Sequence, residues 1–179
     1  MAINVEKIQA LMISTDSDVE FATALSNEVV MEKAAELDSL MREIQNNVVN
    51  AENPTDTTIE YYLMQLTNAL YFINTRIEYF GFYEDITKAN AKLRYNEAYA
   101  ENQLNTAANK VKATVADNQL YAENNSIDET MLNLIYSRSV RILKGKVDAA
   151  GEMVRTLSKI LSAHMNESFV TRSARRLCE

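Results

Sequence analysis

Apolar residues recur at helical intervals along most of the chain. From residue 30 they alternate at spacings of four and three, as Val30, Ala34, Leu37, Met41, Ile44 and Val48. This heptad seam is typical of a helix that packs along a partner helix, and it predicts a helix from about Val19 to Asn50. Asp16 or Ser17 can cap its first turn. A short helix is also expected over residues 2–13.

A second seam follows Pro54, which ends the preceding helix because proline disfavours helical backbone at Asn53. Its apolar positions are Ile59, Leu63, Leu66, Leu70, Ile73, Ile77 and Phe80. The phase then shifts at Gly81, and the stripe continues as Phe82, Ile86, Ala89, Leu93, Ala100 and Leu104. We therefore expect one very long helix that starts near residues 55–58. It bends or stutters near Gly81 without reversing the chain, and weakens around residues 102–109.

The last third of the chain predicts a short helix and a long one. Residues 110–113 are expected to form a linker, and Thr114 to cap a helix over residues 115–122. Ser126 and Glu129 match a capping box for a helix from Ile127 to about His164. The seam of that helix is Leu132, Tyr136, Val140, Leu143, Val147, Ala150, Val154, Leu157 and Leu161.

These patterns predict an all-α fold, in which long amphipathic helices with heptad stripes form an elongated bundle. The sequence divides into an N-terminal helical segment (1–53), a helical core (54–165) and a basic C-terminal tail (166–179). Helices of about 35–50 residues span on the order of 50–75 Å. A chain of 179 residues does not cover the far ends of such rods, so we expect a homo-oligomer, most simply a cyclic one.

Composition excludes several classes of protein. Hydrophobic residues make up 47% of the chain, which excludes a wholly disordered protein. Three glycines and one proline are too few for turn-rich sandwiches, barrels or glycine-rich phosphate loops. One cysteine and one histidine exclude zinc sites of the Cys/His type and disulfide frameworks. Carboxylates spaced by four, such as Glu97 and Glu101, are typical of a solvated helix surface. We therefore predict no catalytic residue, no metal and no cofactor.

The net charge of −7 is unevenly distributed. The first 137 residues carry a net charge of −12, and residues 138–179 carry +5. An acidic body with a basic C-terminal region can contact a polyanion. Alternatively, the two regions attract each other between neighbouring subunits.

Two basic groups are candidates for contacts with a nucleic-acid backbone. Lys88, Lys92 and Arg94 stand next to Tyr95 and Tyr99, and aromatic rings beside cations can stack bases. The second group trails the seam of the last helix and consists of Arg138, Arg141, Lys144, Arg155 and Lys159. Neither group has the geometry for reading bases, so binding should be independent of sequence. The same stripe would also suit salt bridges to acidic helices of another subunit.

The aromatic stretch from Tyr61 to Tyr83 is better explained as core and subunit interface.

Residues 84–165 resemble the phage recombination mediators of the UvsY type. The resemblance rests on the long helix with its cations and tyrosines, on the Lys-Ala-Thr-Val-Ala-Asp stretch at 112–117, and on the final long helix with Lys144 and Lys146. It implies a ring oligomer that binds single-stranded DNA and helps to load a recombinase onto DNA coated by a single-strand-binding protein. It also implies DNA contacts at Lys88, Lys92, Arg94 and Lys112. The first 55 residues exceed the family's minimal length, and Glu97 adds an acidic residue to the basic patch.

The leading hypothesis is thus a non-enzymatic phage accessory protein for DNA recombination or repair. Its predicted partners are single-stranded DNA, a recombinase, a single-strand-binding protein and other copies of itself. The alternative is a helical structural or scaffolding protein, such as a virion component, that acts through protein contacts. The chain has no apolar run of about 18 residues that could span a bilayer, and no cationic region precedes the first apolar stretch. We therefore expect no membrane partner and a location in the host cytoplasm, or in the virion for the alternative.

Overall fold

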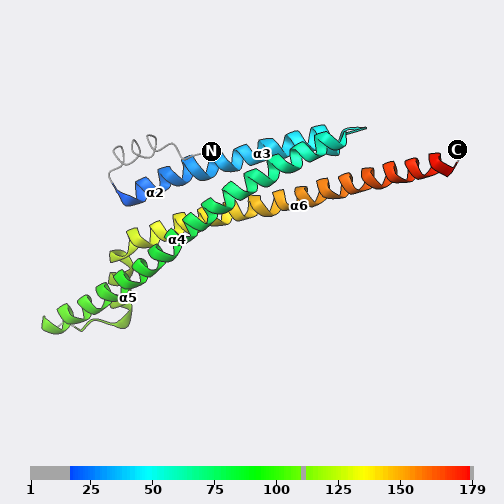
Figure 1. Ribbon diagram of the computed structural model, residues 1–179. Coiled ribbons are helices and arrows are strands. Elements are labelled where there is room, and N and C mark those ends of the chain that lie inside the picture. Colours follow the sequence, from blue (N-terminus) through cyan, green and yellow to red (C-terminus); the bar gives the residue numbers. More distant parts are fainter. Residues whose placement is uncertain (1–16, 110–111, 178–179) are drawn as a thin grey trace. The chain divides into compact units, whose positions relative to one another are not determined.

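The computed structural model describes residues 17–109 and 112–177, with side chains described up to Glu167. The elements follow in the order α2 (Asp18–Ser26), η1 (Asn27–Met31), α3 (Glu32–Ile44), η2 (Gln45–Val49), α4 (Asp56–Ala108), α5 (Val115–Asn125) and α6 (Ile127–Leu177) (Figure 1). η1 and η2 are π-helical turns, and no β-strand occurs in the described residues. The predicted all-α class is confirmed. The helix predicted over residues 2–13 lies outside the described residues.

Short polar side chains start the helices, as the sequence predicts. Ser17 is the N-cap of α2, and its hydroxyl accepts a hydrogen bond from the Glu20 amide at 3.2 Å. Thr114 caps α5, and Asp117 completes a capping box by accepting from the Thr114 amide at 2.8 Å. Such caps satisfy amide groups that the first helical turn leaves without partners.

The capping box predicted at Ser126 does not form. The hydroxyl of Ser126 donates to the carbonyl of Ala122 at 2.9 Å, back into the end of α5. Ser126 is buried, and α6 starts at the very next residue. The hydroxyl therefore satisfies a carbonyl at the end of one helix rather than an amide at the start of the next.

The two longest helices run without interruption. α4 passes through Gly81 as a single helix of 53 residues, so the chain does not reverse there, as predicted. α6 extends to Leu177, beyond its predicted end near His164. Residues 165–177 contain neither glycine nor proline, so nothing in them breaks the helical hydrogen-bond ladder. In the described residues, no helix is long and apolar enough to cross a membrane.

The chain forms two compact units, each built from two separate stretches of sequence. The first unit contains residues up to Val30 together with Arg76–Arg141, and the second contains Met31–Thr75 together with the residues from Ile142 onward. These units combine segments that the division into 1–53, 54–165 and 166–179 keeps apart. Both α4 and α6 contribute to each unit, so each unit is described separately below.

The first unit has a small core with polar cross-links. Its buried apolar side chains are Ala22, Leu25, Val30, Phe80, Ala98, Ala122, Tyr136 and Val140. The hydroxyls of Ser26 and Ser139 lie 2.6 Å apart and join α2 to α6. Asn133 on α6 donates to the carbonyl of Glu84 on α4 at 2.8 Å. These side-chain bonds set the register between helices, because a buried polar group without a partner is costly.

The second unit has a purely apolar core. Its buried side chains are Ala34, Leu37, Ile44, Val48, Ile59, Leu66, Ile73, Leu143, Ala150 and Leu157. All ten belong to the seams predicted for three helices. Lys146 lies 2.5 Å from a carboxylate oxygen of Asp38, and this ion pair links α6 to α3 at the edge of the core.

The predicted continuation of the α4 seam beyond Gly81 is wrong. Phe82, Ile86, Leu93 and Leu104 are exposed, with between 38% and 72% of their surface accessible. The buried line of α4 instead continues from Phe80 to Thr87, seven residues on, and to Ala98, eleven residues further. The reason is that the helix keeps its phase through Gly81, so smaller and more polar residues follow Phe80 into the core. The larger apolar residues form a separate, outer face.

Candidate nucleic-acid interface

Four of the predicted DNA-contacting residues share one face of α4 within the first unit. Lys88, Lys92, Tyr95 and Tyr99 follow one another at spacings of four, three and four, which places them on one side of a helix. Both lysines are exposed, and none of the ion pairs between residues that the structure describes involves either of them. We call these four residues the Lys/Tyr face.

The two tyrosines of the Lys/Tyr face form a stacked pair. Their ring centroids lie 6.4 Å apart with an interplanar angle of 23°, and both side chains are half-buried. Half-buried rings are held in place while one edge or face stays accessible. Such a pair beside two free cations has the chemistry of a platform for single-stranded nucleic acid.

Arg94 lies on a different side of α4. Its guanidinium is 3.8 Å from the carboxylate of Glu97, and both residues line a groove of about 760 Å³ in the first unit. The other charged residues of that groove are acidic: Asp18, Glu20, Asp128 and Glu129. This surplus of negative charge repels phosphate groups. The structure therefore does not bring Arg94 together with Lys88 and Lys92.

The predicted cations of α6 are exposed but belong to different units. Arg138 and Arg141 are part of the first unit, and Lys144, Arg155 and Lys159 are part of the second. Arg155 pairs with Glu152, and the exposed Asp148 stands between Lys144 and Arg155. The basic stripe of α6 is thus interrupted by acidic groups. Lys112 is exposed in the loop that leads to the Thr114 cap.

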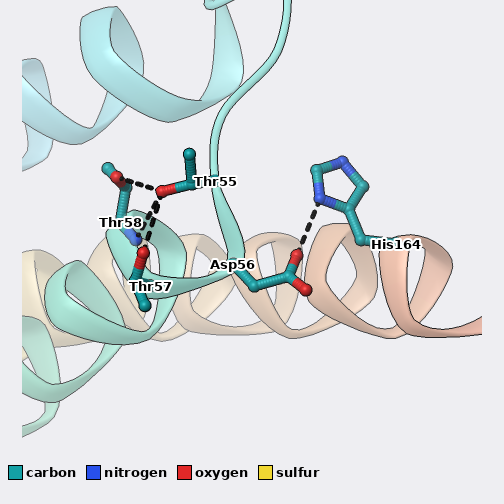
Figure 2. A network of polar contacts seen from close by, with 5 residues as sticks. All are labelled: Thr55, Asp56, Thr57, Thr58 and His164. Carbon is teal, nitrogen blue, oxygen red and sulfur yellow. Dashed lines mark hydrogen bonds and ion pairs between the residues drawn. The ribbon is translucent and has the colours of Figure 1, made fainter. Parts of the chain in front are cut away.

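The single histidine makes a structural contact. His164 on α6 approaches Asp56, the first residue of α4 (Figure 2), and the distance between Nδ1 and Oδ1 is 3.1 Å. Beside it, Thr55 accepts a hydrogen bond from the Thr58 amide at 3.2 Å and so caps α4. In the described part of the chain, no group of three His, Cys, Asp or Glu side chains could hold a metal ion.

The first unit contains an aromatic cluster, part of which lies in the Tyr61–Tyr83 stretch that the sequence assigns to core and subunit interface. The rings of Tyr83 and Tyr136 are stacked with centroids 5.5 Å apart, and Phe80 lies 6.0 Å from Tyr136. The Tyr79 hydroxyl donates to the Tyr83 hydroxyl at 3.3 Å. This bond, together with burial, raises the pKa of Tyr79 to about 12. Burial is also the main cause that raises the pKa of Tyr136. Phe80 and Tyr136 belong to the predicted seams, whereas the stacking of Tyr83 on Tyr136 was not predicted.

Comparison with known proteins adds no relative. No family model, no curated protein and no solved structure matches this chain.

Proposed function

We propose that this protein is a non-enzymatic accessory protein that binds single-stranded DNA through the Lys/Tyr face of α4 and acts as an oligomer. The observation that carries the proposal is the placement of two exposed lysines and a stacked tyrosine pair on one helical face. In this arrangement Lys88 and Lys92 contact phosphates, and Tyr95 and Tyr99 stack bases. One such face gives modest affinity, so several copies on one strand supply the rest through multivalency.

Its cellular role would be the one that the resemblance to UvsY-type mediators implies. The protein would bind DNA that a single-strand-binding protein coats, and would recruit a phage recombinase by protein contacts. The proposal narrows the DNA site relative to the sequence-based prediction. It keeps Lys88, Lys92, Tyr95 and Tyr99, whereas Arg94 faces acidic groups. Lys112, Arg141, Lys144, Arg155 and Lys159 would contribute secondary phosphate contacts.

A salt titration tests the DNA site. Binding of a fluorescent oligo-dT of about 30 nucleotides is measured by anisotropy at increasing salt, with a duplex of equal length for comparison. We expect binding to the single strand at low salt. Each lysine that contacts a phosphate should contribute about 0.7 to the slope of log affinity against log salt concentration. Lys88→Ala combined with Lys92→Ala should therefore weaken binding and flatten the slope by about 1.4.

The same helix offers a matched control for this test. Arg94→Ala removes one cation from α4 on the side that faces the acidic groove, so it should leave both affinity and slope nearly unchanged. Tyr99→Ala should reduce affinity at every salt concentration because stacking of a base is lost, and Tyr99→Phe should restore it. No binding at low salt would refute the proposed function. Equal losses for Arg94→Ala and Lys88→Ala would refute the site.

A scaffolding role is the second candidate, and the exposed apolar residues of α4 favour it. Tyr71, Phe82 and Leu93 are each more than half exposed, as is typical of surfaces that bind other proteins. In this case the protein would associate without binding DNA, so the salt titration separates the two candidates.

A further inference from the structure

A second apolar face of α4 lies within the first unit. Tyr79, Phe82, Ile86, Ala89 and Leu93 follow one another at spacings of three, four, three and four, and we call them the outer α4 face. All five are exposed, with Tyr79 at 47%, Phe82 at 62% and Leu93 at 58%. The buried residues Phe80, Thr87 and Ala98 occupy the opposite side of the same helix. α4 therefore has one face for its own unit and one without a partner in the described residues.

The spacing of the outer α4 face indicates what covers it. Alternation of three and four is the seam of a helix that packs lengthwise against another helix. At one end of this seam, Leu93 also lines the acidic groove of its own unit. Monomeric proteins rarely expose contiguous apolar stretches of this length. A second copy of the same helix offers a surface of identical length and spacing.

Charged residues flank the outer α4 face in an ordered way. On one flank, Glu78 and Lys92 lie at opposite ends. On the other flank, Arg76 and Glu97 do, and Glu97 also pairs with Arg94 of its own chain. Along the first flank the charge changes from negative at Glu78 to positive at Lys92. Along the second flank it changes from positive at Arg76 to negative at Glu97. If a second copy lies antiparallel, Glu78 meets Lys92 of that copy, and Arg76 meets its Glu97. Because the pair is two-fold symmetric, each of these two contacts occurs twice, which gives four attractive pairs. The only repulsive pair among these flanking charges is Asp85 with Asp85 of the second copy.

Side-chain sizes favour the same direction. In the antiparallel register Phe82 packs against Leu93 of the second copy, and Ile86 packs against its Ala89, so large residues meet smaller ones. A parallel pair would place Phe82 against Phe82 and Ala89 against Ala89, which alternates crowding with gaps. Well-packed interfaces set large side chains opposite small ones.

We propose that the outer α4 face binds the same face of a second copy in antiparallel orientation, as a two-fold symmetric interface centred between Ile86 and Ala89. Such a contact is isologous, so both copies use the same residues. It deepens the proposed function, because it supplies the self-association on which multivalent DNA binding rests. The Lys/Tyr face points away from the middle of this seam, and only Lys92 borders both surfaces.

Sedimentation velocity tests the interface. The wild-type chain should sediment as a species of at least twice its 20.3 kDa mass at micromolar concentration. Phe82→Glu combined with Ile86→Glu should raise the dissociation constant at least about 100-fold and yield monomer, because four charges would be buried in one seam. Leu134→Glu is the matched control: this residue is 62% exposed on α6 of the same unit, and its replacement should leave the mass unchanged. Circular dichroism checks that each variant stays helical.

Charge variants test the direction of the pair. Glu78→Lys should weaken association about tenfold, since two attractive contacts become repulsive. Adding Lys92→Glu to the same chain should restore it, because the swapped charges attract again. In a parallel pair Lys92 would instead face Glu97 of the second copy, so Lys92→Glu would set two carboxylates against each other and weaken association further.

Asp85→Asn should tighten the antiparallel pair a few-fold by removing its one repulsion, and would leave a parallel pair unchanged.

Several outcomes would overturn the inference. These are a wild-type monomer at high concentration, an oligomer that survives Phe82→Glu with Ile86→Glu, or a double charge swap that fails to restore association. Loss of the dimer would weaken DNA binding by removing multivalency. The Lys/Tyr face is therefore tested within the dimer by Lys88→Ala alone, because Lys92 borders both surfaces. Lys88→Ala changes only the Lys/Tyr face and Glu78→Lys only the flank of the seam. A dimer that binds no oligo-dT would therefore refute the proposed function and leave the interface standing.

Discussion

Tyr79 illustrates how one position of α4 serves two environments. Its ring is 47% exposed on the outer face, while its hydroxyl donates to Tyr83, which stacks on the buried Tyr136. The hydrogen bond favours the protonated phenol, and burial acts in the same direction. This contact ties the exposed seam to the aromatic cluster of the core.

The pKa of Tyr79 gives the first prediction at this scale. Because folding raises this pKa from 10.0 to about 12, the contribution of Tyr79 to stability is complete below pH 10 and is lost as the pH rises towards 12. Tyr83→Phe removes the main cause of the shift and should lower the Tyr79 pKa towards 10. NMR titration of ring-labelled tyrosine measures it. An unchanged Tyr79 pKa in this variant would show that the hydrogen bond is not the cause.

Asp117 gives a second prediction at the scale of single residues. Its carboxylate accepts hydrogen bonds from the Thr114 amide and hydroxyl, and these bonds lower its pKa below 3.8. The contribution of the capping box is therefore present above pH 3.8 and is lost as the pH falls through the lowered pKa.

Replacement of Thr114 tests this assignment. Thr114→Ala should raise the Asp117 pKa and fray the start of α5, whereas Thr114→Ser should preserve both the cap and the low pKa. NMR titration of the carboxyl carbons and amide exchange in α5 measure the two effects. If the alanine and serine variants titrate alike, the hydroxyl has no part in the capping box.

At the scale of elements, α4 is a helix with two apolar faces, of which one is buried and the other is exposed. Phe80 and Phe82 stand two residues apart, yet one is 1% exposed and the other 62%. A rotation of about 200° separates them on the helix, so one side chain enters the core and the other the outer face.

This pair of phenylalanines provides the third prediction. Phe80→Ala should reduce the free energy of unfolding by about 3–5 kcal/mol, because it leaves a cavity beside Tyr136. Phe82→Ala should have a much smaller effect in dilute solution and act mainly by weakening self-association. Chemical denaturation of both variants at low protein concentration measures the difference. Equal destabilisation by the two substitutions would contradict the assignment of the two faces.

At the scale of the whole molecule, charge is unevenly distributed along the chain. The net charge of −12 over the first 137 residues includes an acidic groove, yet the Lys/Tyr face stands within the same stretch. Net charge alone therefore neither excludes nor establishes a contact with nucleic acid. Local arrangement on a helical face decides where a polyanion can bind.

Self-association leads to the fourth prediction, at this largest scale. Binding of a second copy stabilises only the folded chain, so the melting temperature should rise with protein concentration. The variant with Phe82→Glu and Ile86→Glu should melt at a temperature independent of concentration. Thermal unfolding across a hundredfold range of concentration, followed by circular dichroism, measures both. A wild-type melting temperature that stays constant over this range would argue against any dimer.

Much of the fold followed from the sequence. Heptad spacing predicted the seams of α3, α4 up to Phe80 and α6, and short polar residues predicted the caps at Ser17 and Thr114. These features are local, because spacing and side-chain hydrogen bonds within one turn determine them. The predicted cap at Ser126 does not form, because its hydroxyl is not determined within a single helical turn. Two helices meet at this residue, and the hydroxyl donates to the carbonyl of Ala122 at the end of α5.

The candidate site followed from the sequence only in part. Residue spacing alone places Lys88, Lys92, Tyr95 and Tyr99 on one face. The exclusion of Arg94 required the groove, whose acidic residues come from three separate helices. The basic stripe of α6 likewise is regular in the sequence, but it is divided between two units and interrupted by Glu152.

The sequence by itself determined that this protein is helical and where its helices begin, because periodicity and capping act over a few residues. Only the tertiary structure decided which of the two apolar lines of α4 is buried. After Gly81 the residues with the largest apolar side chains stay outside, and Thr87 and Ala98 enter the core. The physical reason is that a continuous helix keeps its phase: once Phe80 packs against Tyr136, rigid geometry fixes the face of every later residue, whatever its hydrophobicity.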